Sequence, residues 1–443
     1  MERSKADEDF TAKILDHIYS GYEPGDESLE VLGDPIADVI ARTENNDVLS
    51  TAIQTLERTG GLNDPSKLKA ALGRRHNYYV IECLGRASQN KQTARELLIP
   101  LLDKADTDDR FYACLALSRL GGANDRIAAT LAEILPNRGS FNHSEEDVEK
   151  LIASLGSAGK AVMPRLIGIL GTDDFDEFPL DAFLSTGIDP IPHLKAGIVG
   201  DHAQYRIGCA RRVSEFHEWS DQQRRELVGA LMQFVGSLDL KALGQGDAAR
   251  PDLWEVLIAL SRLNPDESVM PKMVEILKHM PHSHSAGHAT EVLGAIGLPA
   301  KQSLSHLMRL EIASWVGWRE IRISEAMAAI EPGQLGLTGI KRCLRLVAAE
   351  RIYEDWPQVE QLMDLIVALG PRSHVFKDEL SAIVNSELME VQRRIHAAYA
   401  LARLFPEDPQ WRTFLKSVAN RRSPLARVWA QGRLDALLEQ TAE

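Results

Sequence analysis

The sequence predicts an all-α fold, a right-handed superhelical α-solenoid of about eleven antiparallel helix pairs. Three observations predict it. Leu, Ala, Glu and Arg dominate the composition while aromatic residues make up only 6%, a balance that favours helices over strands. Apolar residues recur at i, i+3, i+4 and i+7, the spacing of amphipathic helices. Related segments return about every 35 residues, as in repeat arrays whose units contact only their neighbours.

The second helix of each predicted pair carries the clearest repeat. Residues 110–122 (RFYACLALSRLGG) and 394–405 (RIHAAYALARLF) both begin with Arg, are rich in Ala and reach a Leu ten residues later. A conventional globular enzyme has no reason to show a constant spacing of such segments. The corresponding frames end near Leu84, Leu120, Leu155, Thr186, Phe216, Leu263, Ile296, Ile330, Leu369, Leu404 and Leu437.

The first helix of several predicted pairs has a proline in its first turn. Pro164 follows a turn of small residues and precedes an amphipathic run. Proline is tolerated there because the first N–H groups of a helix have no intrahelical acceptor. Pro100, Pro192 and Pro271 repeat the placement.

Two antiparallel helices in about 35 residues, with proline in the first and Ala-rich packing in the second, resemble HEAT repeats. The closer likeness is to the HEAT-like repeats of bacteria, typified by the phycobilin lyase group. The resemblance covers roughly residues 35–440. It implies the fold more than the function, because that group includes scaffolds, adaptors, transport factors and a few enzymes.

The repeated Arg has a structural interpretation and a functional one. HEAT repeats are similar in carrying an Asp in the turn and an Arg just after it. The resemblance implies a ladder between repeats, in which the carboxylate accepts first-turn N–H groups and the neighbouring guanidinium. Recognition of a ligand by the Arg side chains is the alternative. The predicted ladder consists of Arg74, Arg110, Arg206, Arg394 and Arg427, with Asp106 and Asp201 ahead of two of them.

Departures from the repeat predict the domain organisation. Residues 1–34 fit no repeat, and we expect them to form an N-terminal helical cap, since solenoid ends need a polar cover. Residues 35–234 then form the N-terminal half of the HEAT-like repeats. Residues 235–252, rich in Gly, are the candidate insertion or hinge. Residues 253–443 form the C-terminal half with its cap.

Charge and cysteine usage restrict partners and compartment. The net charge of −14 repels phosphate backbones, so we expect a protein partner and no nucleic acid. The four cysteines form no C-x-x-C pair, which indicates buried thiols in a reducing compartment. The start of the chain is charged rather than signal-like, and nowhere do 18 apolar residues run together. We therefore expect a cytoplasmic protein without a membrane span or cofactor; the sequence does not indicate its oligomeric state.

The turns between paired helices predict a partner-binding edge. Turns at 103–109 and 171–178 are acidic, either as caps of helix N-termini or as docking sites for a basic segment. Later turns are rich in His and Trp. Exposed Trp tends to mark partner contacts, although the rings could fold back over helix ends instead. The predicted partner-binding residues are Trp315, Trp318, Trp356, Tyr353, His282 and His284.

Residues 279–291 (HMPHSHSAGHATE) hold four of the 13 histidines. His284 and His288 are four apart and could share a helix face with Glu291, so that two imidazoles and a carboxylate would meet an ion such as zinc. Capping of helix ends and contact with a partner are the competing interpretations. Capping is the interpretation that the repeat frame favours, so we expect no metal and keep these three residues as weak candidates.

No catalytic motif is found. A di-iron site of the deoxyhypusine hydroxylase type needs several His-Glu dipeptides, and the chain has one, His217-Glu218. A DNA glycosylase of the HEAT-like type needs a cationic face, which the net charge opposes. No Gly-rich phosphate loop, nucleophile elbow or H-E-x-x-H helix is present. The sequence thus favours a non-enzymatic scaffold or adaptor that presents a concave solenoid surface and a Trp/His-rich loop edge. The alternative is a HEAT-like lyase or another enzyme subunit that handles a small ligand or tetrapyrrole.

Overall fold

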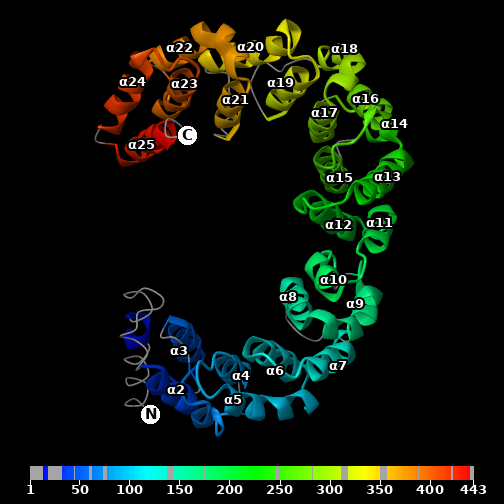
Figure 1. Ribbon diagram of the computed structural model, residues 1–443, viewed down its shortest axis with the longest axis vertical. Coiled ribbons are helices and arrows are strands. Elements are labelled where there is room, and N and C mark those ends of the chain that lie inside the picture. Colours follow the sequence, from blue (N-terminus) through cyan, green and yellow to red (C-terminus); the bar gives the residue numbers. More distant parts are fainter. Residues whose placement is uncertain are drawn as a thin grey trace. The chain divides into compact units, whose positions relative to one another are not determined.

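The computed structural model describes residues 13–17, 32–43, 45–58, 62–72, 77–104, 106–136, 144–172, 175–244, 250–281, 283–310, 318–349, 357–387, 389–420 and 423–439. Across these residues the fold is all-α, as predicted, and its helices pack in pairs (Figure 1). Extended pairing in the described part is limited to two isolated bridges, Leu62 with Ala87 and Thr172 with Phe175. None of the described helices is long and apolar enough to cross a membrane.

The chain divides into two compact units, Met1–Gly197 and Ile198–Glu443, and the division falls within α11 (Ile191–Val199). The candidate hinge, 235–252, lies inside the second unit, and its residues 245–249 are outside the described residues. The candidate cap, 1–34, is described only at 13–17 and 32–34. Both assignments stay predictions.

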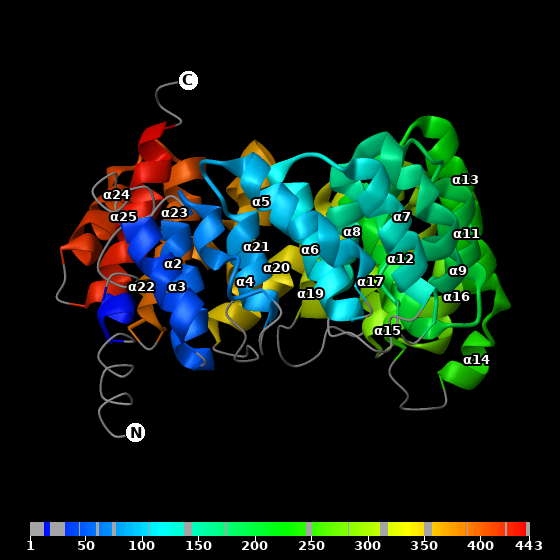
Figure 2. The same ribbon diagram turned by 90° about the horizontal axis from the view of Figure 1, so that it is seen from below.

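In each unit the second helices of the pairs pack against one another in succession, and we call this set the first layer. Figure 2 shows the two helices of one pair of the first unit, α2 of the other layer and α3 of the first layer, side by side. In the first unit the first layer contains α3 (Asn46–Arg58), α4 (Asn77–Gly85), α6 (Thr107–Leu120), α8 (Glu145–Leu155) and α10 (Leu180–Thr186). In the second unit it contains α12 (Ala203–Glu215), α15 (Pro251–Arg262), α17 (His284–Ile296), α19 (Trp318–Ile330), α21 (Pro357–Ala368), α23 (Val391–Leu404) and α25 (Pro424–Glu439).

The other helices of the pairs form the second layer, which is more broken. Short 3-10 segments interrupt it because prolines and glycines stand at the junctions. In the first unit it contains α2 (Gly33–Arg42), η2 (Pro65–Leu68), α5 (Lys91–Leu98), η3 (Ile99–Asp103), α7 (Asn124–Ile134), η5 (Gly156–Ala161) and α9 (Met163–Ile169). In the second unit it contains α13 (Asp221–Ser237), α14 (Leu240–Leu243), η6 (Glu267–Val269), α16 (Met270–His279), η7 (Leu298–Ser303), α18 (Leu304–Leu307), α20 (Gln334–Ala348), η8 (Gly370–Phe376), α22 (Lys377–Asn385) and α24 (Pro409–Ala419).

Proline positions explain part of this division of the second layer into short segments. Pro164 and Pro271 occupy the first turns of α9 and α16, as the sequence predicts. Pro100 does not begin the helix of its pair: α5 already runs from Lys91 to Leu98, and Pro100 opens the following segment η3. Pro100 has no backbone N–H and therefore cannot donate the i→i−4 hydrogen bond that would continue α5, so the chain tightens into a 3-10 turn there.

Glycine ends several first-layer helices. Gly297, at φ +70°, follows α17, and Gly370, at φ +58°, follows α21. The left-handed region costs glycine little, so the chain can turn at once toward the second layer. The helices that end in this way are kept short, and the apolar core stays between the two layers. In the second unit Phe376, Leu401 and Leu415 are fully buried parts of that core.

Candidate functional site

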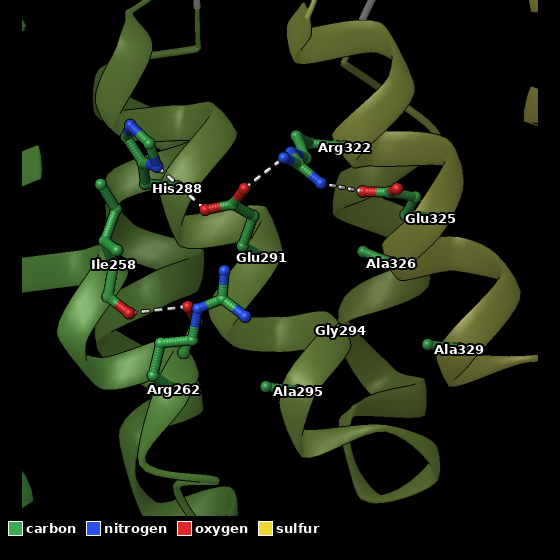
Figure 3. Close-up of a pocket in the computed structure, with 11 residues that line it drawn as sticks. Ile258, Arg262, His288, Glu291, Gly294, Ala295, Arg322, Glu325, Ala326 and Ala329 are labelled. Atoms are coloured by element: carbon green, nitrogen blue, oxygen red, sulfur yellow. Dashed lines mark hydrogen bonds and ion pairs between the residues drawn. The ribbon is translucent and has the colours of Figure 1, made fainter. Parts of the chain in front are cut away.

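A hollow of about 470 Å³ crosses three consecutive first-layer helices of the second unit, α15, α17 and α19 (Figure 3). We call it the three-helix groove. Its walls and floor come from all three helices, so it exists only when consecutive repeats are stacked. The lining residues are Ile258, Ser261, Arg262, His288, Glu291, Gly294, Ala295, Arg322, Glu325, Ala326 and Ala329.

Small residues form the floor of the groove. A Cβ atom placed on Gly294 would lie 3.1 Å from Cα of Ala326, tighter than ordinary contact, so α17 and α19 approach closely at this level. Ala295 and Ala329 are exposed beside this contact. With no long side chain on the floor, the backbone of an occupant could come near the helices.

A chain of ion pairs runs across the groove (Figure 3). Nδ1 of His288 lies 2.9 Å from Oε2 of Glu291, and Nε of Arg322 lies 2.7 Å from Oε1 of the same carboxylate. Nη1 of Arg322 lies 2.6 Å from Oε2 of Glu325. The exposed Arg262 points from α15 toward Glu291. Both signs of charge are therefore held in fixed positions before anything binds.

Two of the three candidate metal ligands, His288 and Glu291, lie within this arrangement. His288 and Glu291 are in contact, whereas the ring of His284, at the start of α17, packs against Trp254 with 5.0 Å between ring centres. The described residues include no group of three or more His, Cys, Asp or Glu side chains placed to hold a metal ion. The carboxylate of Glu291 is shared by His288 and Arg322.

The predicted loop edge falls largely beyond the described part of the chain. Trp315, Tyr353, Trp356 and His282 lie outside the described residues. The backbone of Trp318 begins α19, but its side chain is outside them as well. The edge stays a prediction.

The predicted ladder residues share one position. Arg110, Arg206, Arg394 and Arg427 are each the fourth residue of their helices, α6, α12, α23 and α25; Arg74 lies outside the described residues. A common position does not give them a common environment, because Arg206 is buried and Arg427 is exposed.

Arg206 forms the most extensive network of these residues. Its Nε donates to the carbonyl of Ile198, 3.0 Å away, and its Nη2 donates to the carbonyl of Gly200. Its Nη1 lies 2.6 Å from Oδ2 of Asp252, a buried residue of the next first-layer helix. Arg250 binds both oxygens of that carboxylate at 2.9 Å. The guanidinium of Arg206 thus joins α11, α12 and α15.

Arg394 repeats part of this arrangement. Its Nε donates to the carbonyl of Val384, 2.7 Å away, and Val384, like Ile198 in α11, is the penultimate residue of the preceding helix. Each guanidinium also lies over an aromatic ring of the following helix, Arg206 over Phe234 and Arg394 over Phe414. These Arg side chains therefore satisfy carbonyls at the end of one helix while contacting the next.

The remaining ladder residues make other contacts. The side chain of Asp106 caps α6 by accepting the N–H of Asp109 at 2.9 Å, and Arg110 pairs with Glu133 of α7. Asp201 is exposed, and the cap of α12 is His202, whose Nδ1 accepts the N–H of Tyr205.

A second polar cluster lies on α21, α23 and α25. Nη2 of Arg433 is 3.1 Å from Nδ1 of His396 and pairs with Glu360. Burial and the positive charge of Arg433 lower the pKa of His396 to about 4, although Asp364 opposes the shift. His396 is therefore neutral at pH 7.

The four cysteines, Cys83, Cys114, Cys209 and Cys343, are buried, and none of them forms a disulfide. Burial raises the pKa of Cys114 to about 12 and that of Cys343 to about 11. These thiols stay protonated at neutral pH, the state that is least reactive.

Sequence reasoning missed Arg262, Arg322 and Glu325. A usable signal was present, because His288 and Arg322 stand eight residues before the frame ends Ile296 and Ile330. Equivalent positions on adjacent repeats lie side by side, so this spacing places both side chains on the same face.

These features define the class of the protein: an all-α protein of paired helices in two layers, the packing of α-solenoids. No protein-family model matches the chain, and no curated protein matches its sequence. Among solved structures, importin beta in an ammonium sulfate condition aligns over 97% of this chain and 67% of its own, with 11% identity and a TM-score of 0.49.

Two further structures are similar. Kap121p aligns over 96% of this chain and 56% of its own, with 11% identity and a TM-score of 0.47. A chain from work on a phosphorylation switch that controls the interaction between cadherin and beta-catenin aligns over 97% of this chain and 96% of its own. Its identity is 14% and its TM-score is 0.34.

Proposed function

We propose that the protein is a non-enzymatic scaffold or adaptor that holds a segment of a partner protein in the three-helix groove. The observation that carries the proposal is the groove itself, which combines a floor of small residues with charged side chains of both signs. An extended segment could lay its backbone over Ala295 and Ala329. Its polar groups could then pair with Arg262 and Glu325.

The ion-pair chain supports binding rather than catalysis. Both carboxylate oxygens of Glu291 are already engaged, Oε2 by Nδ1 of His288 and Oε1 by Nε of Arg322, so the side chain is placed to hold these helices together rather than to receive a proton from a ligand. Fixed charges of both signs instead favour a partner with a complementary pattern, which gives specificity more than affinity. The Trp/His-rich loop edge, with Trp315, Trp318, Trp356, Tyr353, His282 and His284, is proposed to extend the contact with aromatic anchors.

The groove can be tested by filling it. Ala295→Tyr with Ala329→Tyr places two rings on exposed floor positions without touching the core. Ala129→Tyr, at an exposed position of α7 in the first unit, is the matched control. Each variant would be used in affinity purification from the native organism, with mass spectrometry of the captured proteins and circular dichroism to check helical content.

We expect the double variant to lose a partner that the wild type and the Ala129→Tyr control both retain. If the double variant captures the same partners as the wild type, the groove is excluded as the binding site. The loop edge is tested separately by Trp315→Ala with Trp318→Ala, which should weaken capture while helical content stays intact. Unchanged capture would mean that these Trp residues are structural.

A further inference from the structure

A second hollow, of about 710 Å³, lies on the other layer of the second unit, between α20 and η8. We call it the basic hollow. It shares no lining residue with the three-helix groove, which is built from first-layer helices. The proposed function does not account for it.

The basic hollow is lined by cations in an acidic protein. Lys341, Arg342, Arg345 and Arg372 line it, and none of its lining residues is acidic, although the net charge of the chain is −14. Positions 338, 341, 342 and 345 follow successive turns of α20, so their side chains share one exposed face. The arrangement concentrates positive potential where an acidic ligand would meet it.

One carboxylate of the protein already shows how these cations bind acidic groups. An oxygen of Glu379, on α22, lies 3.3 Å from Nζ of Lys341 and 3.4 Å from Nε of Arg345. Because one carboxylate is shared by two cations, Lys341 and Arg345 together keep excess positive charge. The side chain of Arg345 is also 67% exposed, so a ligand can reach it.

The hollow is apolar as well as basic. Leu337 and Phe376 are buried at its base, while Val375 is 57% exposed beside them. A nucleic-acid backbone would pair with the cations but would gain nothing from the apolar base. The net charge of the protein would also repel it. An acidic peptide with an apolar side chain satisfies both parts of the lining.

We propose that the basic hollow binds an acidic segment of a partner protein. The segment inserts an apolar side chain beside Val375, and its carboxylates pair with Lys341, Arg345 and Arg372. Because this surface lies on the second layer, the protein can hold such a segment while the three-helix groove holds another. The protein would then connect two partners.

The test uses the full chain and a displayed library of short random peptides. We expect peptides selected on the wild type to carry net negative charge and at least one large apolar residue. A fluorescent copy of the most enriched peptide should bind about tenfold or more weakly to Arg345→Glu with Arg372→Glu, since two favourable charge contacts become repulsive. Val375→Asp should weaken the same peptide.

The matched control is Lys301→Glu with Lys416→Glu, which makes the same charge change at exposed positions outside the hollow. It should bind like the wild type, as should the variant with the filled three-helix groove. Arg345→Gln with Arg372→Gln replaces the reversed variant if that one loses helical content.

Three outcomes would overturn the proposal: no acidic and apolar preference among the selected peptides, equal binding by the reversed variant, or a DNA duplex that displaces the peptide at physiological salt. The last would assign the hollow to nucleic acid. None of these outcomes bears on the three-helix groove, so the two proposals fail independently.

Discussion

Replacing Asp252 with Asn should destabilise the contact between α12 and α15. Asp252 is 3% exposed and Arg206 is 6% exposed, so the substitution leaves a buried guanidinium without its carboxylate. Breaking a buried pair from one side costs about 3–5 kcal/mol. The low end, about 3 kcal/mol, applies because Arg206 keeps the carbonyls of Ile198 and Gly200 as acceptors. Asn preserves the volume, so no cavity adds to the cost.

Local stability is the quantity to measure, because a long repeat array need not unfold in one step. Hydrogen exchange of peptides from α12 and α15 should become about 100-fold faster in the variant, since 1.4 kcal/mol corresponds to tenfold. Glu255→Gln is the control, because its exposed pair with Arg211, at 3.2 Å, joins the same two helices. Glu255→Gln should lower the local stability of α12 and α15 by less than about 1 kcal/mol. Equal exchange in the two variants would refute the reasoning.

The same carboxylate gives the expected pH dependence of this contact. Burial acts to raise the pKa of Asp252, but hydrogen bonds and positive charge from Arg250 and Arg206 outweigh it, so the pKa lies below its ordinary value. A lowered carboxyl pKa contributes stability above the pKa of the unfolded chain and loses it as pH falls through the folded pKa. The protection of α12 and α15 that depends on Asp252 should therefore persist to about pH 4 and disappear below it.

Other predictions test the packing, the buried histidine and the thiols. Gly85→Ala should lower the thermal midpoint, by an amount that corresponds to about 1–3 kcal/mol, because its Cβ would lie 2.8 Å from Cα of Ala116. Gly229→Ala, with nothing within 4 Å, should instead be neutral or stabilise by up to about 1 kcal/mol. The pKa of His396 is lowered to about 4, so the unfolded chain takes up the proton before the folded one does. The stability of the protein should therefore fall by up to about 3 kcal/mol as pH falls from about 6.5 to 4. Thermal melts of His396→Gln should lack this pH dependence; the same slope in both proteins would contradict it. A thiol reagent at pH 8 should label none of the four buried cysteines in the native protein and all of them in urea, and rapid native labelling would contradict their burial.

The sequence predicted the first layer closely because its signal is local. Frames expected to end at Leu120, Leu155, Ile296, Ile330 and Leu404 coincide with the ends of α6, α8, α17, α19 and α23. A run of apolar residues at helical spacing followed by a turn carries enough information to set such an end. The second layer was predicted less well, since prolines and glycines let short 3-10 and α segments alternate there. Amphipathic spacing does not distinguish those segments.

Contacts between repeats could not be predicted in the same way. The resemblance implied that the carboxylate of a turn, Asp106 or Asp201, would accept the neighbouring guanidinium. Arg206 instead pairs with Asp252, 46 residues further along the chain. Which carboxylate reaches a guanidinium depends on the distance and angle between neighbouring helices, and the residue spacing within one repeat determines neither of them. The three-helix groove was missed for the same reason, because it arises where Gly294 meets Ala326 across two helices.

The Arg206 network and the three-helix groove are physically linked through α15. Arg206 fixes α15 through Asp252 at the N-terminal end of that helix, and Arg262 enters the groove from the other end. Within the groove Arg322 fixes α19 to α17 through Glu291. Ion pairs between repeats therefore hold three successive helices at set distances before any partner arrives. Binding to such a preformed surface loses less conformational entropy than binding to helices that must first be brought together. Asp252→Asn should consequently weaken partner capture by the groove although Asp252 is not one of its lining residues, and peptide binding in the basic hollow, on the other layer, should stay unchanged.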